Sequence, residues 1–277
     1  MSDLRGMWVD GVEGTLVPAD DRGLQYGDGL FETILLSGGA APLWSRHMQR
    51  LLRGCEQLGL PAPDPELLAR EAERVVAGMQ RAVIRITLTR GSGARGYALP
   101  KQAECTRIVA AFDPPFIPAD WYARGIRVRF GELRVAAQPR LAGIKHLNRL
   151  EQVLARAEWS DPEIVEALLF DAKDRLISAT AANVFVACDG DLITPALDQC
   201  GVAGVAREEI LAQYPDTKVR EVTREELMQA DEIFLSSSVR GILPVREVDG
   251  HAFKPGAFAR ALQASWRALG LASEIQA

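Results

Sequence analysis

A proline-rich break near the middle of the chain constrains its fold most. Pro114, Pro115 and Pro118 stand within five residues of one another. They favour an extended connector, because proline fixes its backbone torsion and cannot donate a ladder hydrogen bond. On both sides of the break, strand-like and helix-like segments alternate, which predicts mixed α/β structure. We therefore expect a smaller N-terminal α/β domain over residues 1–113, a connector over 114–120 and a larger C-terminal α/β domain over 121–277.

Local patterns predict the elements of each half. Ser45 can cap a helix that ends before Gly59, and Pro65 suits the first turn of a second helix that runs to about Met79. In the first half, apolar runs predict strands over residues 30–36, 82–89 and 106–112. In the second half we expect strands over 126–130, 165–170, 183–188, 218–222 and 233–236, and helices that end near 159 or span 205–213, 225–229 and 257–269.

Composition excludes several classes of function. The net charge of −5 over 277 residues argues against a nucleic-acid-binding face, which needs a basic surplus. No apolar run approaches the roughly 18 residues of a membrane helix. The 4 cysteines and 3 histidines are scattered without metal-ligand spacing, so we expect no metal site. We expect a reduced, cytoplasmic protein that acts on a small molecule.

Lys145 differs from the other lysines in its surroundings. It lies among Leu141, Ile144 and Leu147, just before a segment with helical periodicity. A lysine that is partly desolvated there has a lowered pKa, so its amine becomes a usable nucleophile or base. The alternative is a surface lysine whose stem covers apolar neighbours. The other lysines lie in polar or turn-forming stretches: Lys101, Lys173, Lys218 and Lys254.

A glycine-rich segment over residues 91–96 matches the G-x-G-x-x-G pattern of dinucleotide-binding folds. We reject that interpretation, because such a fold needs a helix between two strands and Pro100 interrupts the few residues available. The segment instead predicts a loop that carries Arg90, Arg95 and Tyr97. Guanidinium groups match the geometry of a substrate carboxylate, and the alternative is a solvated hairpin tip.

Three further segments are candidates for holding an anion. Gly201 to Gly204 form a turn that opens a helix, whose unpaired N–H groups favour phosphate. Ser236 to Ser238 end a strand, and Arg50 lies on the helix over residues 45–58. Each is weak alone. Together with Lys145 they form the set that pyridoxal 5′-phosphate needs, namely a Schiff-base lysine and a phosphate site.

The chain resembles the fold-type IV pyridoxal-phosphate enzymes, which include branched-chain aminotransferases, D-amino-acid aminotransferase and aminodeoxychorismate lyases. The resemblance covers nearly the whole length and rests on residues 21–32, 47–51, 141–154, 182–185, 204–207 and 244–245. The segments Thr-Arg-Gly-Ser-Gly-Ala-Arg-Gly-Tyr (89–97) and Leu-Ala-Gly-Ile-Lys-His-Leu-Asn-Arg-Leu-Glu (141–151) are most similar to the lyases.

The resemblance implies a two-domain fold like that of D-amino-acid aminotransferase, pyridoxal 5′-phosphate as cofactor and a homodimer. It implies that Lys145 is the Schiff-base lysine and proton shuttle. The other cofactor contacts that it implies are a phosphate site and a residue against the pyridine ring: Arg50, Val205, Ala206, Ser237 and Ser238 for the phosphate, and Val202 for the ring. The residues implied on the substrate side are Phe31, Arg90, Arg95 and Tyr97, with Arg107 and Arg240 as weaker candidates.

Two positions depart from the family pattern. Phe31 stands where transaminases of the family often carry tyrosine, which fits a lyase better. Ser178 stands where the family usually has a glutamate that keeps the pyridine nitrogen protonated. A neutral hydroxyl can form a hydrogen bond with the nitrogen but cannot stabilise its positive charge, so the electron sink should be shallower.

The implied reaction converts 4-amino-4-deoxychorismate into 4-aminobenzoate and pyruvate, a step of folate biosynthesis. One alternative is an aminotransferase that acts on branched-chain or D-amino acids with the same cofactor. Another is a cofactor-free binding protein that keeps the fold. Phe31 and the loop over residues 90–97 favour the lyase.

Overall fold

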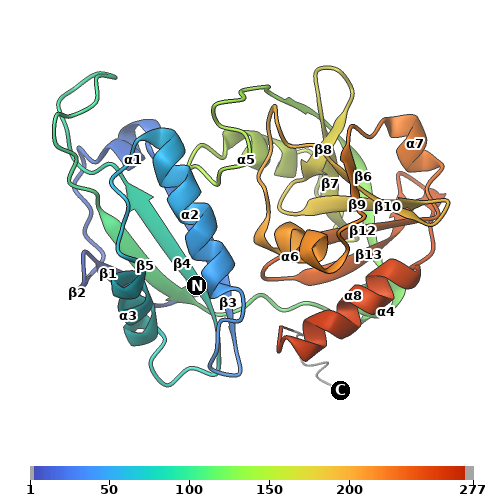
Figure 1. Cartoon of the computed structure of the whole chain (residues 1–277), viewed down its shortest axis with the longest axis horizontal. Helices are drawn as coiled ribbons and strands as arrows, with labels where there is room; N and C mark the ends of the chain where they lie inside the picture. Colours follow the sequence, from blue (N-terminus) through green and yellow to red (C-terminus); the bar gives the residue numbers. More distant parts are fainter. Residues whose placement is uncertain (1–2, 272–277) are drawn as a thin grey trace. The chain divides into compact units, whose positions relative to one another are not determined.

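The computed structural model describes residues 3–271, which form two compact units (Figure 1). The chain up to Pro115 belongs to the first unit, and the chain from Phe116 belongs to the second, so the division lies within the connector expected over 114–120. One short segment, Ile144–Asn148, belongs to the first unit. We expected Lys145 in the C-terminal domain. It groups with the N-terminal unit instead, because its backbone pairs with a strand of that unit.

The first unit is a five-stranded antiparallel sheet in the order β2-β1-β5-β4-β3. Helix α2 lies against β3, and α3 lies against β1 and β5 (Figure 1). Alternating apolar residues of β3 and β4, such as Ile34, Ile84 and Ile86, form the core. The elements are β1 (Leu4–Val9), β2 (Val12–Glu13), α1 (Arg22–Tyr26), β3 (Gly29–Ser37), α2 (Trp44–Leu58), α3 (Pro65–Val75), β4 (Arg81–Thr89) and β5 (Arg107–Phe112).

The caps of α2 and α3 explain where these helices begin and end. Gly59 ends α2 in the left-handed conformation, at φ 60°, as expected. The expected cap at Ser45 is wrong, because α2 begins at Trp44 and its N-cap is Leu43, which makes no side-chain cap hydrogen bond. Helix α3 begins at Pro65 behind the Asp64 side chain, which accepts a hydrogen bond from the N–H of Glu66.

The second unit is built on a nine-stranded mixed sheet in the order β11-β10-β9-β12-β13-β6-β7-β8, with β14 paired to β13. Its core includes Phe185 and Phe234, whose rings stack 5.1 Å apart between their centroids. The elements are α4 (Ala119–Arg124), β6 (Ile126–Val135), α5 (Leu150–Arg156), β7 (Ile164–Asp171), β8 (Leu176–Ala179), β9 (Asn183–Cys188), β10 (Asp191–Pro195), α6 (Val205–Gln213), β11 (Lys218–Arg220), α7 (Arg224–Met228), β12 (Glu232–Ser237), β13 (Gly241–Val248), β14 (His251–Ala252) and α8 (Ala257–Ala268).

Helix α5 is shorter than expected, and of its apolar residues Ala155 is buried in the core while the larger ones are exposed. It spans Leu150–Arg156, although the periodicity predicted a helix that begins just after Lys145 and runs to about Trp159. Leu150, Val153 and Leu154 are 74%, 60% and 60% exposed. Helical spacing of apolar residues therefore marks a surface face here and not a buried one.

The rejection of a dinucleotide fold is confirmed, because β4 and β5 pair antiparallel and residues 90–106 between them contain no helix.

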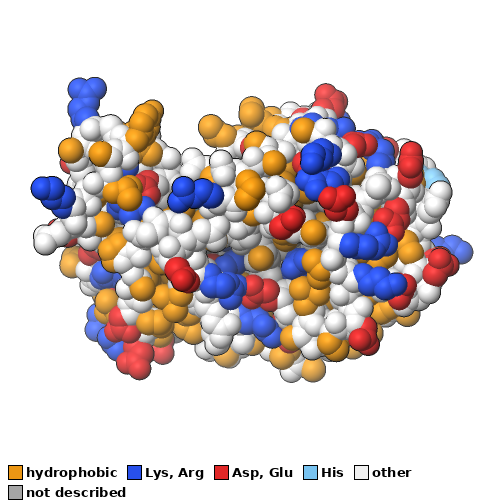
Figure 2. All heavy atoms as spheres, turned by 45° about the horizontal axis from the view of Figure 1, so that its top comes forward, with side chains coloured by type: hydrophobic (Ala, Val, Ile, Leu, Met, Phe, Trp, Pro, Cys, Tyr) orange, Lys and Arg blue, Asp and Glu red, His pale blue; other side chains and the backbone are white. Residues whose placement is uncertain are grey.

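Acidic and basic side chains are interspersed on the face that Figure 2 shows. Among residues 3–271, no helix is both long and apolar enough to cross a membrane. Within the same residues, no group of three or more Cys, His, Asp or Glu side chains is arranged to hold a metal ion.

Candidate active site

The backbone of Lys145 is held by strand β3. Its carbonyl accepts a hydrogen bond of 3.0 Å from the N–H of Phe31, and the N–H of Leu147 donates to the carbonyl of Gly29 at 2.9 Å. Gly29 permits this pairing, because a Cβ there would lie 2.4 Å from the carbonyl oxygen of Leu88 and 2.8 Å from Leu147 Cδ1. A reactive lysine positioned by a sheet has a defined location, which covalent catalysis requires.

The amine of Lys145 lies over an aromatic ring. Its Nζ is 4.3 Å from the centroid of the Phe31 ring, a cation–π distance. The side chain is partly buried. Phe31 is itself 7% exposed and was predicted on the substrate side, so the structure brings these two predicted residues together. An apolar, hydroxyl-free ring beside the amine offers no proton donor that competes with Lys145 for a substrate.

On the opposite face of β3, Glu32 forms a buried cluster with His47 and Arg50 of α2. The Nδ1 of His47 is 2.6 Å from Glu32 Oε2, and Arg50 donates through Nε to Oε1 at 2.8 Å and through Nη2 to Oε2. These side chains are 1%, 0% and 5% exposed. The predicted phosphate-binding arginine is therefore oriented by a carboxylate that the sequence reasoning missed.

The contacts within this cluster determine the protonation states of Glu32 and His47. Burial alone raises the pKa of Glu32, but the Arg50 charge and hydrogen bonds from Arg50 and His47 lower it to about 2. Burial and the charges of Arg50 and Lys145 lower the pKa of His47, although Glu32 raises it, and the lowered pKa favours the neutral imidazole. Because the carboxylate only accepts, Nδ1 carries the proton. The Nε2 atom of His47 has no hydrogen-bond partner among residues 3–271.

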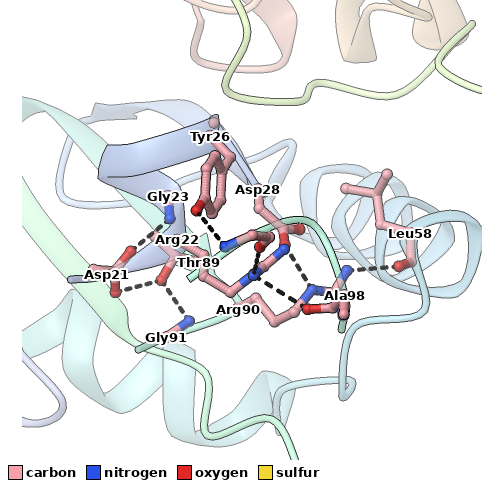
Figure 3. Close-up of polar contacts among 12 residues, drawn as sticks. Asp21, Arg22, Gly23, Tyr26, Asp28, Leu58, Thr89, Arg90, Gly91 and Ala98 are labelled. Atoms are coloured by element: carbon pink, nitrogen blue, oxygen red, sulfur yellow. Dashed lines mark hydrogen bonds and ion pairs between the residues drawn. The ribbon is translucent and has the colours of Figure 1, made fainter. Parts of the chain in front are cut away.

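Arg90 is used within the protein fold, which argues against its predicted contact with a substrate carboxylate. Its Nε donates to Asp28 at 2.8 Å, and Nη1 and Nη2 donate to the carbonyls of Gly59 and Leu58, both at 2.8 Å (Figure 3). The residue is 4% exposed. Nη1 and Nη2 thus bind carbonyls at the end of α2, which lack helical partners, while Nε binds Asp28.

Arg22 completes this structural cluster. It donates through Nε to Asp28 at 2.9 Å and through Nη1 to the carbonyl of Gly96 at 3.0 Å (Figure 3). Burial raises the pKa of Asp28, but the hydrogen bonds and charges of Arg90 and Arg22 together outweigh burial and lower it. The two arginines therefore attach both ends of the glycine-rich loop to one carboxylate.

Arg95 and Tyr97 lie at the exposed tip of that loop. Tyr97 is 86% exposed, and its ring meets the ring of Tyr26 edge-on at 5.5 Å between centroids. The loop is held below them, where the N–H of Gly96 donates to the Tyr26 hydroxyl at 3.1 Å. Within this single chain neither residue is brought to Lys145, and their predicted contact with substrate stays a prediction.

Arg107 and Arg240, the weaker substrate candidates, are both ion-paired inside the protein. Arg107 donates through Nη2 to Glu71 at 3.0 Å, and this contact raises the pKa of Arg107. Arg240 donates to the buried carboxylate of Glu166, which also accepts from the N–H of Ala181 at 3.2 Å. These pairs have structural roles, and neither supports contact with a substrate.

In the second unit, the turn before α6 has a defined shape. The N–H of Gly143 donates to the carbonyl of Gly201 at 3.0 Å, and Asn183 donates through Nδ2 to the carbonyl of Val202 at 2.9 Å. A Cβ on Gly204 would lie 2.0 Å from Asn183 Oδ1. A side chain at this position would displace the Asn183 amide, which holds the carbonyl of Val202. The ring contact that the resemblance implies for Val202 stays a prediction.

The N-terminus of α6 fits a phosphate. Its N-cap residue, Gly204, has no side chain that could cap the helix, and no side-chain cap hydrogen bond is formed. Val205 and Ala206 are each 1% exposed, so the N–H groups of this first turn lie away from water. A buried helix start without a cap is a favourable place for an anion.

The serine segment at the end of β12 is only partly engaged. Ser237 Oγ accepts from the N–H of Arg240 at 3.1 Å. Ser236 is 2% exposed, and its hydroxyl has no partner within the described part of the chain. Ser238 is partly buried in the turn that follows β12. Ser178 lies partly buried in β8, opposite Leu169 of β7, and its role at the pyridine nitrogen stays a prediction.

Comparisons with known proteins identify the family to which the chain belongs. The amino-transferase class IV model matches residues 29–248. An aminodeoxychorismate lyase from Vibrio harveyi is 36% identical over 243 residues, which cover 86% of this chain and 89% of that protein.

Solved structures share the fold. The crystal structure of 4-amino-4-deoxychorismate lyase from Pseudomonas aeruginosa superposes with a TM-score of 0.91 at 42% identity, over 95% of this chain and 98% of that one. A branched-chain amino acid aminotransferase from Escherichia coli superposes with a TM-score of 0.83 at 24% identity, over 100% and 98% of the two chains, which shows a common fold. The expected mixed α/β, fold-type IV architecture is thereby confirmed, and the chain belongs to the amino-transferase class IV family.

Proposed function

We propose that this protein is a pyridoxal-phosphate-dependent lyase that converts 4-amino-4-deoxychorismate into 4-aminobenzoate and pyruvate. The observation that carries the proposal is the 42% identity with the Pseudomonas aeruginosa lyase over nearly the full length of both chains. The placement of Lys145 by β3, beside Phe31, supports it independently, because a lyase of this kind needs one fixed amine.

Each unit carries residues that fit one part of the cofactor. Lys145 supplies the amine that holds its aldehyde carbon, and Arg50 supplies a guanidinium for its phosphate. The buried, uncapped start of α6 supplies the N–H groups of Val205 and Ala206 for a phosphate. Ser237 and Ser238 are the proposed hydroxyl donors, and Val202 the proposed contact to the pyridine ring. When bound, pyridoxal phosphate forms a Schiff base with an amine and withdraws electrons from the bond that breaks.

The work of Lys145 in the reaction is to move a proton. Once its Nζ is displaced by the substrate amine, it accepts the proton from the ring carbon that bears that amine. The bond from the ring to the enolpyruvyl oxygen then breaks, pyruvate leaves as its enol, and the ring becomes aromatic. The ring of Phe31 has no hydroxyl that could exchange a proton with Nζ, so the proton stays on Lys145.

Ser178 suits elimination better than transamination. A serine cannot balance the positive charge of a pyridinium nitrogen, whereas a glutamate can. Aromatisation supplies driving force that a transamination lacks, so a lyase tolerates a weaker electron sink. We expect Ser178→Glu to raise the aminotransferase side activity relative to the lyase activity. Unchanged rates for both activities would contradict this role of Ser178.

The test of the function is a product assay on the purified protein with cofactor. We expect 4-aminobenzoate and pyruvate in equal amounts from 4-amino-4-deoxychorismate. The alternative, an aminotransferase of branched-chain or D-amino acids, predicts keto-acid formation from an amino acid and no 4-aminobenzoate. A protein that acquires no visible cofactor absorbance and turns over neither substrate would instead be a cofactor-free binding protein.

A homodimer in the cytoplasm, acting in folate biosynthesis, completes the proposal. The exposed apolar face of α5, formed by Leu150, Val153 and Leu154, supports association of two copies. Cell fractionation tests the location, and growth of a strain that requires 4-aminobenzoate tests the pathway.

A further inference from the structure

Two cationic groups lie over the ring of Phe31. One is the amine of Lys145, with Nζ 4.3 Å from the ring centroid. The other is the guanidinium of Arg85, with Cζ also 4.3 Å from that centroid. The two cations are therefore separated by no more than twice this distance. A molecule whose amine reacts at Lys145 brings its other end within reach of Arg85.

The register of β3 and β4 explains why Arg85 reaches this ring. Thr33 lies opposite Arg85 and Phe31 lies opposite Thr87, so these four side chains share one face of the sheet. Glu32 points to the opposite face, where it binds His47 and Arg50. The nearest carboxylate along β3 is thus directed away from Arg85.

The Arg85 guanidinium has no anionic partner within the described part of the chain. It makes no hydrogen bond or ion pair with any side chain among residues 3–271, although it is partly buried. Burial lowers the pKa of Arg85, and no carboxylate acts in the opposite direction. Four other buried or partly buried arginines of this unit contrast with it, because they pair with Asp28, Glu32 or Glu71: Arg22, Arg90, Arg50 and Arg107. Arg81 of the same strand is also partly buried, and its Nε has no hydrogen-bond partner among residues 3–271, but it is not placed over the Phe31 ring.

A partly buried guanidinium without an anionic partner is energetically unfavourable. An anion that binds Arg85 would relieve this cost, because no protein carboxylate competes with it for the guanidinium. A planar carboxylate matches the guanidinium in a two-pronged contact. The simpler explanation is an arginine that only stacks on an aromatic ring. That explanation predicts no effect of Arg85 on carboxylate binding, so the two can be separated.

We propose that Arg85 binds the ring carboxylate of the substrate, which is the carboxylate that remains in 4-aminobenzoate. Arg85 thereby selects substrates whose carboxylate lies across the ring from the reacting amine and whose ring becomes aromatic in the reaction. The inference rests on the proposed function. The rigid six-membered ring fixes the span from amine to carboxylate, whereas the enolpyruvyl carboxylate rotates about its ether bond. Arg85 therefore sets specificity, while Lys145 carries the chemistry.

Four holoenzymes test this inference: wild type, Arg85→Gln, Arg85→Lys and Arg81→Gln. Arg81 lies on the same strand and the same face, opposite Ser37, and is the matched control. For Arg85→Gln we expect KM for 4-amino-4-deoxychorismate to rise about ten- to hundred-fold, the cost of losing one charged hydrogen-bonded contact. We expect kcat and the visible cofactor absorbance to change much less. Arg85→Lys should fall between, and Arg81→Gln should match wild type.

Inhibition by the product separates a carboxylate contact from a general structural effect. Arg85→Gln should weaken inhibition by 4-aminobenzoate by a similar factor, but leave inhibition by aniline, which lacks the carboxylate, unchanged. Equal inhibition of wild type and Arg85→Gln by 4-aminobenzoate would overturn the inference. A wild type that forms no 4-aminobenzoate would overturn the proposed function, and calorimetric titration of 4-aminobenzoate into wild type and Arg85→Gln would still decide the role of Arg85.

Discussion

At the scale of single residues, two charged side chains of the first unit lie within strands that are otherwise largely apolar. Glu32 lies within the apolar run of β3, and Arg85 lies within that of β4. A lone charge inside an apolar strand is the sequence signal that could have found both. The sequence could not show which face each would occupy relative to α2 or Lys145, because that depends on the register of strands distant in the chain.

Replacement of Glu32 tests the buried cluster. Glu32→Gln leaves Arg50 as a buried charge without its carboxylate, so we expect a loss of about 3–5 kcal/mol in the free energy of unfolding. Urea denaturation at neutral pH measures this loss. Glu66→Gln, on an exposed carboxylate of α3, is the control and should change stability by less than about 0.5 kcal/mol. Equal stability of the two variants would contradict the role of Glu32.

The same carboxylate predicts a pH dependence. The pKa of Glu32 is lowered from 4.5 to about 2 on folding, so its stabilising effect is complete above pH 4.5 and disappears as the pH falls towards 2. The lowered pKa of His47 acts in the same direction below pH 6.5, because the unfolded chain binds that proton more readily. We expect the difference in stability between wild type and Glu32→Gln to narrow across the range from pH 4.5 to 2. A constant difference would show that the Glu32 charge is not its source.

At the scale of elements, the glycine-rich loop is attached by residues that local sequence could not connect. Arg90 was predicted to face substrate because a guanidinium on a glycine loop suits a carboxylate. Its actual partners, Asp28 and the carbonyls of Leu58 and Gly59, come from segments far away in the sequence. The end of α2 and the start of α3 were predicted, because Gly59 and Pro65 mark them locally, whereas α3 ends at Val75 and not near Met79. The surface position of α5 was not predicted, because spacing alone does not say what covers a helix.

Replacement of Arg90 should therefore affect stability and not only catalysis. Arg90→Met removes three hydrogen bonds from a buried site and leaves carbonyls of the α2 terminus without partners, so we expect a loss of about 2–3 kcal/mol. Thermal denaturation measures it. Arg95→Met, at the exposed tip of the same loop, should leave the midpoint unchanged. A midpoint for Arg90→Met equal to that of wild type would mean that these bonds contribute no net stability.

At the scale of the whole molecule, the proposed dimer depends on α5. Leu154 is 60% exposed, and a charge there should prevent burial of this face against a second copy. We expect wild type to sediment as a dimer and Leu154→Glu to shift towards monomer. Leu16→Glu, at a residue that is 88% exposed, is the control and should remain a dimer. A wild-type monomer that is fully active would contradict the proposal.

The family and the fold could be predicted from the sequence, since the segments around Lys145, Arg50 and the start of α6 carry the resemblance. The sequence could not predict which arginines pair with carboxylates of the fold and which do not. Arg90 and Arg107 pair with carboxylates of the fold, while Arg85 pairs with no carboxylate among residues 3–271, and only the three-dimensional placement of the carboxylates distinguishes them.

The most direct test of the proposed role of Lys145 is the Lys145→Ala variant, on which the visible cofactor absorbance and the formation of 4-aminobenzoate are both measured. We expect both to be lost, while Lys101→Ala and Lys173→Ala retain both, because only Lys145 is held by β3 beside Phe31. A Lys145→Ala protein that keeps the cofactor absorbance and still forms 4-aminobenzoate at the wild-type rate would contradict the account.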